Sequence, residues 1–229
     1  MIFETCPMLN DIPWIKHGFF GIDNPYAMDK TIAGVHRFNN DYPNTLLLKQ
    51  IHSDIVIVPP CGTEQEADAS ITDQSDLALA VKTADCCPVL LVCTHSHQIA
   101  AIHAGWPGAL NQIAAKTARQ LIQQGAIPES ILAAIGPHIQ HDSMTVKDDV
   151  RDQFMAQQPD KQAFFTVFED RWKMNTAGIV SRQLQDQGIS QIWVSNIDTF
   201  TNPDYASYRR HKQQNTASDP RNISLIMKA

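Results

Sequence analysis

The stretch VKTADCCPVLLVCTHSHQIAAIHAGWPG, residues 81–108, contains two apolar runs that decide the fold. The runs are PVLLVCT at 88–94 and QIAAIHAGW at 98–106, and a short polar segment joins them. Neither run has the polar alternation that is typical of a half-exposed strand, so each is expected to be buried on both faces. We therefore predict two buried strands connected by a polar turn.

The segments on either side of this stretch predict alternating strands and helices. Strands are expected at 45–58 (as strand, turn and strand), 69–73, 77–85, 130–136, 191–197 and 223–229, and helices at 108–125, 146–158 and 175–188. Gly125 is expected to end the first helix, and Asn175 and Gly188 are expected to begin and end the last. The order, strand-rich first and then mixed, predicts one α/β domain with a mixed sheet over residues 1–229.

The composition excludes several classes of protein. Of the 229 residues, 43% are hydrophobic and 18% are charged, which indicates a globular chain, and the formal net charge of −6 argues against a nucleic-acid partner. We find no signal peptide and no apolar run long enough to span a membrane. The five cysteines are an odd number, so we expect reduced thiols and a cytoplasmic location.

Cysteine and histidine in the apolar strands are the first candidates for metal ligands. His103 lies inside an apolar strand and His52 ends one, and each can be either a core residue or a ligand. The two histidines between the apolar runs, His95 and His97, are expected on the surface. Cys87 and Cys93 fit the ordinary role of cysteine as a small buried hydrophobe.

Cys86 differs because it follows Asp85, an acid at the end of an apolar run. A carboxylate there costs free energy unless it is paired, and it can orient a neighbouring metal ligand or cap the end of the strand. The spacings from His52 to Cys86 and from Cys86 to His103 match no zinc-finger pattern. Any metal site must therefore be assembled from separate strand ends.

Five segments resemble the YfiH-like family in sequence and in order. They are KQIHSD (49–54), EADASITDQSDLALAVKTADCCPVLL (66–91), IAAIHAGWPG (99–108), IGPHI (135–139) and YASYRR (205–210). Members of this family are also described as laccase-domain proteins, polyphenol oxidases, peptidoglycan editing factors and purine nucleoside phosphorylases. The resemblance runs from about Trp14 to the C-terminus. It implies one α/β domain with layered mixed β-sheets flanked by helices.

The resemblance also implies a metal, usually zinc, held by His52, Cys86 and His103, which are all intact. Copper could occupy the same donors in vitro, since Cu²⁺ binds more tightly than Zn²⁺. Three protein ligands leave a coordination position open, which is the catalytic arrangement, and zinc lowers the pKa of bound water to about 7. Cys86 is then a thiolate ligand rather than a nucleophile.

The implied chemistry is phosphorolysis of adenosine, inosine, guanosine or methylthioadenosine, together with deamination of adenosine. Asp85, Cys86 and Arg209 are the predicted catalytic residues, and Arg209, Arg210 and His138 are the predicted substrate-binding residues. The two arginines, in a loop after the last helix and strand, either chelate phosphate or form a solvated surface pair. The expected partners are a nucleoside and phosphate, and the expected assembly is a monomer or a small homo-oligomer.

The sequence departs from the family pattern at several positions around the substrate. Pro107 stands where most members have arginine, Met144 replaces a tyrosine, Asp198-Thr199 replaces a cysteine-threonine pair, His211-Lys212 replaces an Asp-Gly pair, and the segment HGFFGIDNPYAMDK (17–30) replaces a longer loop. These differences leave the predicted metal ligands intact. They affect the expected contacts to substrate and phosphate.

Three rival functions follow from the same residues. A multicopper laccase needs many His-x-His pairs, and this chain has one, at His95 and His97, which argues against that activity. A zinc amidase that edits peptidoglycan precursors would use the same metal ligands. A non-catalytic, metal-stabilised binding protein would also keep them, while tolerating the changes around the substrate.

Overall fold

The two apolar runs form an antiparallel hairpin in the computed structural model. Strand β9 (Cys87–Cys93) pairs with β10 (Ile99–Ala104), with Ala104 opposite Cys87 and Ile99 opposite Val92. Every residue of both strands is buried, which confirms the prediction from the sequence. The structure describes residues 3–22, 29–30, 35–37, 42, 44–59, 65–215 and 220–229.

The hairpin is the centre of a mixed six-stranded sheet. Its order is β15 (Gln191–Val194), β11 (Ile131–Ile135), β9, β10, β7 (Ala69–Thr72) and β6 (Val56–Ile57). The outer pairs β11–β15 and β6–β7 are parallel, and the inner pairs are antiparallel. Each of these strands lies in a segment that the sequence predicts to be a strand.

A seven-stranded sheet covers one face of the six-stranded sheet. Its order is β1 (Phe3–Glu4), β2 (Ile15–Phe20), β16 (Asn222–Lys228), β8 (Ala78–Thr83), β5 (Thr45–Leu47), β4 (Val35–Arg37) and β3 (Asp29–Lys30). Apolar side chains of both sheets join one buried cluster, including Leu79, Val81, Ile226, Leu90, Val92 and Leu132. The contact between these faces makes the fold layered, as the family resemblance implies.

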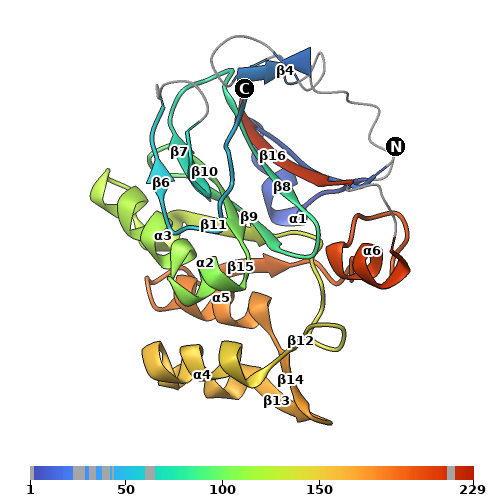
Figure 1. Ribbon diagram of the computed structural model, residues 1–229. Helices are drawn as coiled ribbons and strands as arrows, with labels where there is room; N and C mark the ends of the chain where they lie inside the picture. The colour runs from blue at the N-terminus through green and yellow to red at the C-terminus, as the bar shows by residue number, and fades with distance from the viewer. Residues whose placement is uncertain are drawn as a thin grey trace.

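Helices cover the other face of the six-stranded sheet (Figure 1). They are α2 (Trp106–Leu110), α3 (Ile113–Gln123) and α5 (Thr176–Gln185), and α4 (Asp148–Gln157) lies farther from the sheet, in contact with α2. The Asn175 side chain accepts a hydrogen bond from the Gly178 amide at the start of α5, and Gly125 and Gly188 have positive φ beyond the ends of α3 and α5. These three residues have the capping and terminating roles that the sequence predicts.

Two predictions about secondary structure are wrong. The single helix expected at 108–125 is two helices, because Gln112 has a left-handed backbone with φ of 62° and the chain changes direction there. The arginines Arg209 and Arg210 lie not in a loop but at the start of α6 (Tyr208–Gln214), where the Ser207 hydroxyl accepts from the Arg210 amide.

The remaining elements have weaker sequence signals. A three-stranded sheet has the order β12 (Thr145–Val146), β14 (Arg171–Met174) and β13 (Phe165–Phe168), and it is absent from the predicted elements. Short elements complete the described chain: α1 (Pro7–Asn10) and the 3-10 helices η2 (Pro128–Ser130) and η3 (Pro159–Phe164). The strands of the small sheet are exposed on most of β13 and half-buried elsewhere, so they lack a long apolar run.

Candidate metal centre and its cavity

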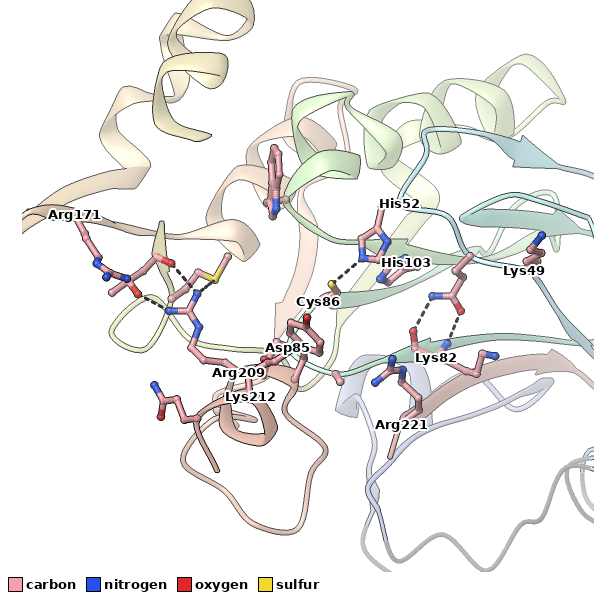
Figure 2. Close-up of a pocket in the computed structure, with 17 residues that line it drawn as sticks. Lys49, His52, Lys82, Asp85, Cys86, His103, Arg171, Arg209, Lys212 and Arg221 are labelled. Atoms are coloured by element: carbon pink, nitrogen blue, oxygen red, sulfur yellow. Dashed lines mark hydrogen bonds between the residues drawn. The ribbon is translucent and has the colours of Figure 1, made fainter. Parts of the chain in front are cut away.

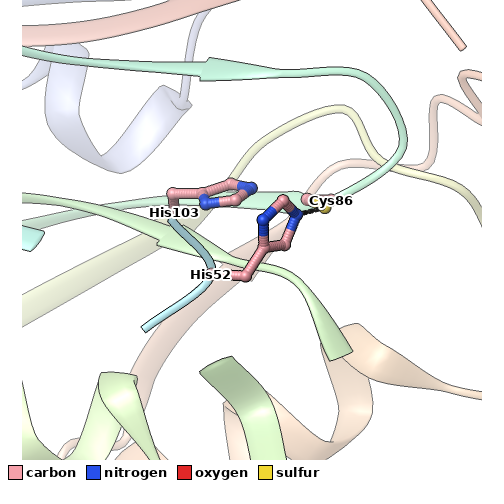
Figure 3. A group of neighbouring side chains, drawn as sticks. All are labelled: His52, Cys86 and His103. Atoms are coloured by element: carbon pink, nitrogen blue, oxygen red, sulfur yellow. Dashed lines mark hydrogen bonds between the residues drawn. The ribbon is translucent and has the colours of Figure 1, made fainter. Parts of the chain in front are cut away.

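Three side chains from separate segments meet at one end of the hairpin (Figure 3). His52 follows β5, Cys86 lies between β8 and β9, and His103 lies in β10. Their ligand atoms all lie within 4.8 Å of one another, and Cys86 Sγ is 3.9 Å from His52 Nε2. In the part of the chain that the structure describes, this is the one group of three or more candidate metal ligands.

The register of the hairpin explains why Cys86 reaches the histidines. Ala104 lies opposite Cys87, so Cys86 and Gly105 are the next residues beyond the paired ends of β9 and β10. A β-carbon on Gly105 would lie 3.0 Å from Cys86 Sγ and 2.9 Å from His52 Cδ2. A β-carbon at this position would therefore displace His52 or Cys86, and glycine lets the cysteine and the histidine approach each other.

A buried carboxylate, Asp68, orients both histidines. Its Oδ1 accepts hydrogen bonds from His103 Nδ1 at 2.7 Å and from the His52 amide at 3.1 Å. Its Oδ2 accepts from the amide and hydroxyl of Ser53, at 2.6 and 2.7 Å, and from the Ile51 amide at 3.2 Å. The bond to Nδ1 leaves Nε2 of His103 as its ligand atom, which is the usual arrangement of a histidine beside a metal.

Asp68 also holds the turn that presents His52. His52 has a φ of 59°, in the left-handed region that is uncommon for a residue with a side chain. The three successive amides of residues 51–53 all point to the Asp68 carboxylate, which compensates the backbone strain. Asp68 directly precedes β7, whose pairing with β10 places it beside His103.

The electrostatics of the group favour a charged network. Burial alone would disfavour charge on His103, which is 3% exposed, but the Cys86 thiolate and the Asp68 carboxylate outweigh it and raise its pKa to about 9. Burial likewise opposes ionisation of Cys86, yet His103 and His52 lower the pKa of the thiol to about 6. Hydrogen bonds from His103 and Ser53 overcome burial and lower the pKa of Asp68 to about 2.

The group lies on the wall of a cavity of about 1040 Å³ (Figure 2). Two aromatic side chains, Trp106 and Tyr208, also line it. The cations among the lining residues are Lys49, Lys82, Arg171, Arg209, Lys212 and Arg221. The cavity therefore combines a candidate metal centre with flat aromatic surfaces and an excess of positive charge, which suits an anionic ligand.

Comparison with known proteins assigns the family. Residues 18–228 match the family model described as multi-copper polyphenol oxidoreductase laccase. The chain belongs to this family. Solved structures similar to this laccase-domain protein include YlmD from Geobacillus stearothermophilus, with a TM-score of 0.81, 18% identity and coverage of 99% of this chain and 98% of that one. The hypothetical protein YfiH of Bacillus licheniformis has a TM-score of 0.78 at 23% identity, covering 94% and 93% of the two chains.

Curated relatives of this laccase-domain protein are named for a different activity. A purine nucleoside phosphorylase of Rickettsia prowazekii (strain Madrid E) is 32% identical over 203 residues, which are 86% of this chain and 84% of the relative. The purine nucleoside phosphorylase YfiH of Escherichia coli (strain K12) is 30% identical over 194 residues, covering 83% and 78%. No helix among the described residues of the laccase-domain protein is long and apolar enough to cross a membrane.

The structure places Asp85 on the cavity wall but bonds it to α6. Its Oδ1 accepts from the Thr199 hydroxyl at 2.8 Å, and its Oδ2 accepts from the Arg209 amide at 2.7 Å. Both carboxylate oxygens thus hold segments distant in the chain, and neither caps the end of the strand that precedes Asp85. The contacts that orient metal ligands belong instead to Asp68, which sequence reasoning missed although it too adjoins an apolar strand.

Of the three predicted substrate-binding residues, only Arg209 lines the cavity. Its guanidinium donates to the Ser143 carbonyl at 3.1 Å and to the Thr145 carbonyl at 2.7 Å. Arg210 points elsewhere because consecutive residues of a helix diverge by about 100°. The Arg210 guanidinium donates to the carbonyls of Thr199, Phe200, Asn202 and Tyr205.

His138 is 2% exposed and lies outside the cavity lining, where its Nδ1 donates to the Gly136 carbonyl at 2.8 Å. The structure therefore does not bring Arg210 and His138 to the candidate site. Burial in the chain interior explains the position of the histidine. The four carbonyl partners explain the position of the arginine.

The positions that depart from the family pattern have distinct surroundings. Pro107 lies in the first turn of α2, and Met144 lines the cavity with its sulfur 3.6 Å from Arg209 Nη2. The Asp198 carboxylate accepts from the Ser143 hydroxyl at 2.6 Å, and Lys212 lines the cavity.

Residues 23–28 of the segment 17–30 lie outside the described residues, as does Cys61. The four described cysteines are free thiols, and His95 and His97 are exposed, as expected.

Proposed function

We propose that this chain is a zinc-dependent purine nucleoside phosphorylase, with the metal held by His52, Cys86 and His103. The gathering of these three ligand atoms within 4.8 Å on a cation-rich cavity wall carries the proposal. The names of the curated relatives support the reaction and the substrate class. The substrates are then a purine nucleoside and inorganic phosphate.

The donor set fits zinc. Tetrahedral zinc with Zn–N of about 2.0–2.1 Å and Zn–S of about 2.3 Å places nitrogen and sulfur ligands about 3.6 Å apart. The separation of Cys86 Sγ and His52 Nε2 is 3.9 Å, and the ligand atoms of all three residues lie within 4.8 Å of one another, so the three side chains would draw closer together on binding the ion. When bound, zinc would act as a Lewis acid and lower the pKa of a water molecule at the open position.

The cavity residues supply binding and orientation for phosphorolysis. In this reaction the bond between the sugar C1′ and the base nitrogen breaks, a phosphate oxygen bonds to C1′, and the base leaves with the electron pair and takes up a proton. Trp106 and Tyr208 offer flat surfaces on which a purine can stack. The cations of the cavity attract phosphate, and Asp68 keeps His103 oriented toward Cys86.

A second activity, deamination of adenosine, is favoured by the number of protein ligands. Three ligands leave one position for water, and the group opens to the cavity. Deamination replaces the C6 amino group of the purine by oxygen from water and releases ammonia. It requires no phosphate, so the two reactions separate on that dependence.

The test measures metal content and nucleoside turnover on the same preparations of the full chain. We expect about one zinc per wild-type chain, with phosphate-dependent release of purine base from at least one of adenosine, inosine, guanosine and methylthioadenosine. Cys86→Ala should lose both metal and turnover. Cys87→Ala is the matched control, because the neighbouring cysteine is fully buried in β9 and belongs to the apolar core.

Retention of one zinc by Cys86→Ala would contradict the assignment of the ligands. A fully metal-loaded wild-type protein that releases neither base nor ammonia from these nucleosides would contradict the substrate class. Ammonia release from adenosine without any need for phosphate would leave deamination as the activity.

A further inference from the structure

Two cations of the cavity share one face of the seven-stranded sheet. Lys82 of β8 lies opposite Ile223 of β16, and Arg221 precedes Ile223 by two residues. Side chains two apart in an extended chain point to the same face, so Arg221, Ile223 and Lys82 are on one side. The same face carries Ala80 and Leu225, and it is opposite the face that packs on the six-stranded sheet.

The backbone around Lys82 is fixed by a neighbouring side chain. Gln50 Nε2 donates to the Lys82 carbonyl at 2.7 Å, and the Lys82 amide donates to Gln50 Oε1 at 2.8 Å. Gln50 belongs to the segment that leads into the His52 turn, and β8 leads through Asp85 into Cys86. The position of Lys82 is therefore tied to the metal ligands by short stretches of chain on both sides.

The side-chain amine of Lys82 is less engaged than the charged groups of Lys49 and Arg209, while the Lys212 ammonium lies over the Tyr208 ring. Lys49 pairs with Glu66 at 2.7 Å, and the guanidinium of Arg209 donates to the carbonyls of Ser143 and Thr145. No hydrogen bond or ion pair engages the Lys82 ammonium among the residues that the structure describes. Lys82 and Arg221 line the same cavity from one face of the sheet, and burial together with the charge of Arg221 lowers the pKa of Lys82.

We propose that Lys82 and Arg221 form the phosphate subsite of the cavity. An oxyanion between the two side chains would relieve their repulsion and accept the hydrogen bonds of the lysine. Arg221 also donates to the Pro220 carbonyl at 3.3 Å, and its guanidinium adds positive charge to the subsite. Figure 2 shows the two cations on one side of the His52–Cys86–His103 group, with Arg171 and Arg209 on the other.

The subsite replaces Arg209 and Arg210 as the predicted phosphate ligands. The choice of phosphate as the anion rests on the proposed function. Binding of inorganic phosphate, however, is measurable without any turnover, so the two hypotheses can fail separately.

The first experiment measures the affinity of the full chain for inorganic phosphate by calorimetry at constant ionic strength. Lys82→Gln should weaken binding by about tenfold or more, the usual effect of losing hydrogen bonds from a charged group. Lys82→Arg should restore most of the affinity. Arg171→Gln is the matched control, because it removes the same charge from the opposite side of the same cavity and should change the affinity less than about twofold.

Arg221→Gln gives a second variant at an exposed position, should Lys82→Gln fold poorly by circular dichroism. Both glutamine variants should raise the KM for phosphate and leave the KM for the nucleoside unchanged. If the wild-type chain turns over no purine nucleoside but loses phosphate binding in Lys82→Gln, the subsite stands and the proposed function fails. Absence of phosphate binding by the wild type, or equal weakening by Arg171→Gln, would overturn the subsite.

Discussion

Replacing Asp68 by asparagine tests how the metal centre is held together. The carboxylate is fully buried and accepts five hydrogen bonds, from three amides, one hydroxyl and the imidazole of His103. Asparagine has nearly the same shape but offers one oxygen and one NH₂ group. Whichever way the amide turns, its NH₂ group faces donors that formerly met an oxygen.

The two orientations have different consequences for the metal ligands. If the NH₂ group faces His103, Nδ1 must become an acceptor and the proton moves to Nε2, which can then no longer bind a metal. If the NH₂ group faces Ser53, the amide and hydroxyl that meet Oδ2 lose their acceptor and the His52 turn is released. Either outcome weakens metal binding, and we expect a loss of about 10- to 100-fold in affinity.

The same change also lowers the stability of the metal-free protein. Hydrogen bonds to a charged group contribute about 1.5–3 kcal/mol each, and at least one is lost while the others weaken. We expect the free energy of unfolding to fall by about 3 kcal/mol, measured by urea denaturation in the presence of a chelator. Since domains of this kind have about 5–15 kcal/mol in total, the variant should remain folded.

Asp85→Asn is the matched control for this experiment. It also alters a carboxylate at a strand end, but the partners of Asp85 are Thr199 and the Arg209 amide, not the metal ligands. We expect it to lose stability and to keep its zinc affinity within about threefold, as determined by competition with a chromophoric chelator. The reasoning would be refuted if Asp68→Asn bound zinc as tightly as the wild type, or if both variants lost affinity equally.

Three further predictions concern other parts of the site and the fold. Gly105→Ala should weaken zinc binding by about tenfold or more, because its β-carbon would lie 2.9 Å from His52 Cδ2; chelator competition measures this, and unchanged affinity would contradict it. Burial lowers the pKa of His17 to about 4. Between pH 6.5 and 4 this histidine therefore binds a proton in the unfolded chain but stays neutral in the folded chain. The free energy of unfolding should accordingly fall by about 2–3 kcal/mol between pH 7 and 4.5. In urea titrations His17→Gln, which can still accept from the Cys6 amide, should lose this pH dependence, and an equally steep decline in the variant would exclude His17 as its source. Arg210→Ala should lower the free energy of unfolding by about 2–4 kcal/mol without changing phosphate affinity, and calorimetry showing weaker phosphate binding would return Arg210 to the substrate site.

The central strands of the two large sheets could be predicted from the sequence because most of them are continuous apolar runs, whereas β2 and the short strands β1, β3 and β4 were missed and the layering of the sheets was implied by the family resemblance alone. The helix at 108–125 could not be divided correctly, since its apolar stripe continues through Gln112, where only the backbone of the folded chain turns left-handed. The small sheet of β12, β13 and β14 lacks such a run, because its strands are largely exposed or half-buried. Hydrophobic periodicity in the sequence identifies strands and helices with a buried face, and it gives no clear signal for strands that are only partly buried.

Local sequence also could not predict which of two acids, Asp68 or Asp85, orients the metal ligands. Asp68 and Asp85 each adjoin an apolar strand, and each needs a partner for its charge. Pairing of β7 with β10 brings Asp68 to His103, which is 35 residues away in the chain. Asp85 instead meets Thr199 and Arg209, which are more than 100 residues away. Strand register, rather than proximity to Cys86 in sequence, decides which acid orients the ligands.

For the cations of the cavity, the hydrogen bonds that each side chain already makes decide whether it can bind phosphate. Sequence reasoning favours Arg209 and Arg210 because guanidinium chelates phosphate well, but it cannot see that carbonyl groups of the fold already occupy both side chains. A cation that closes a loop stabilises the protein and has few donors left for a ligand. The ammonium of Lys82 has no such bond within the described chain, so it attracts an anion for a physical reason that residue type alone does not reveal. The bonds a side chain already makes are therefore a better guide to its function than its charge.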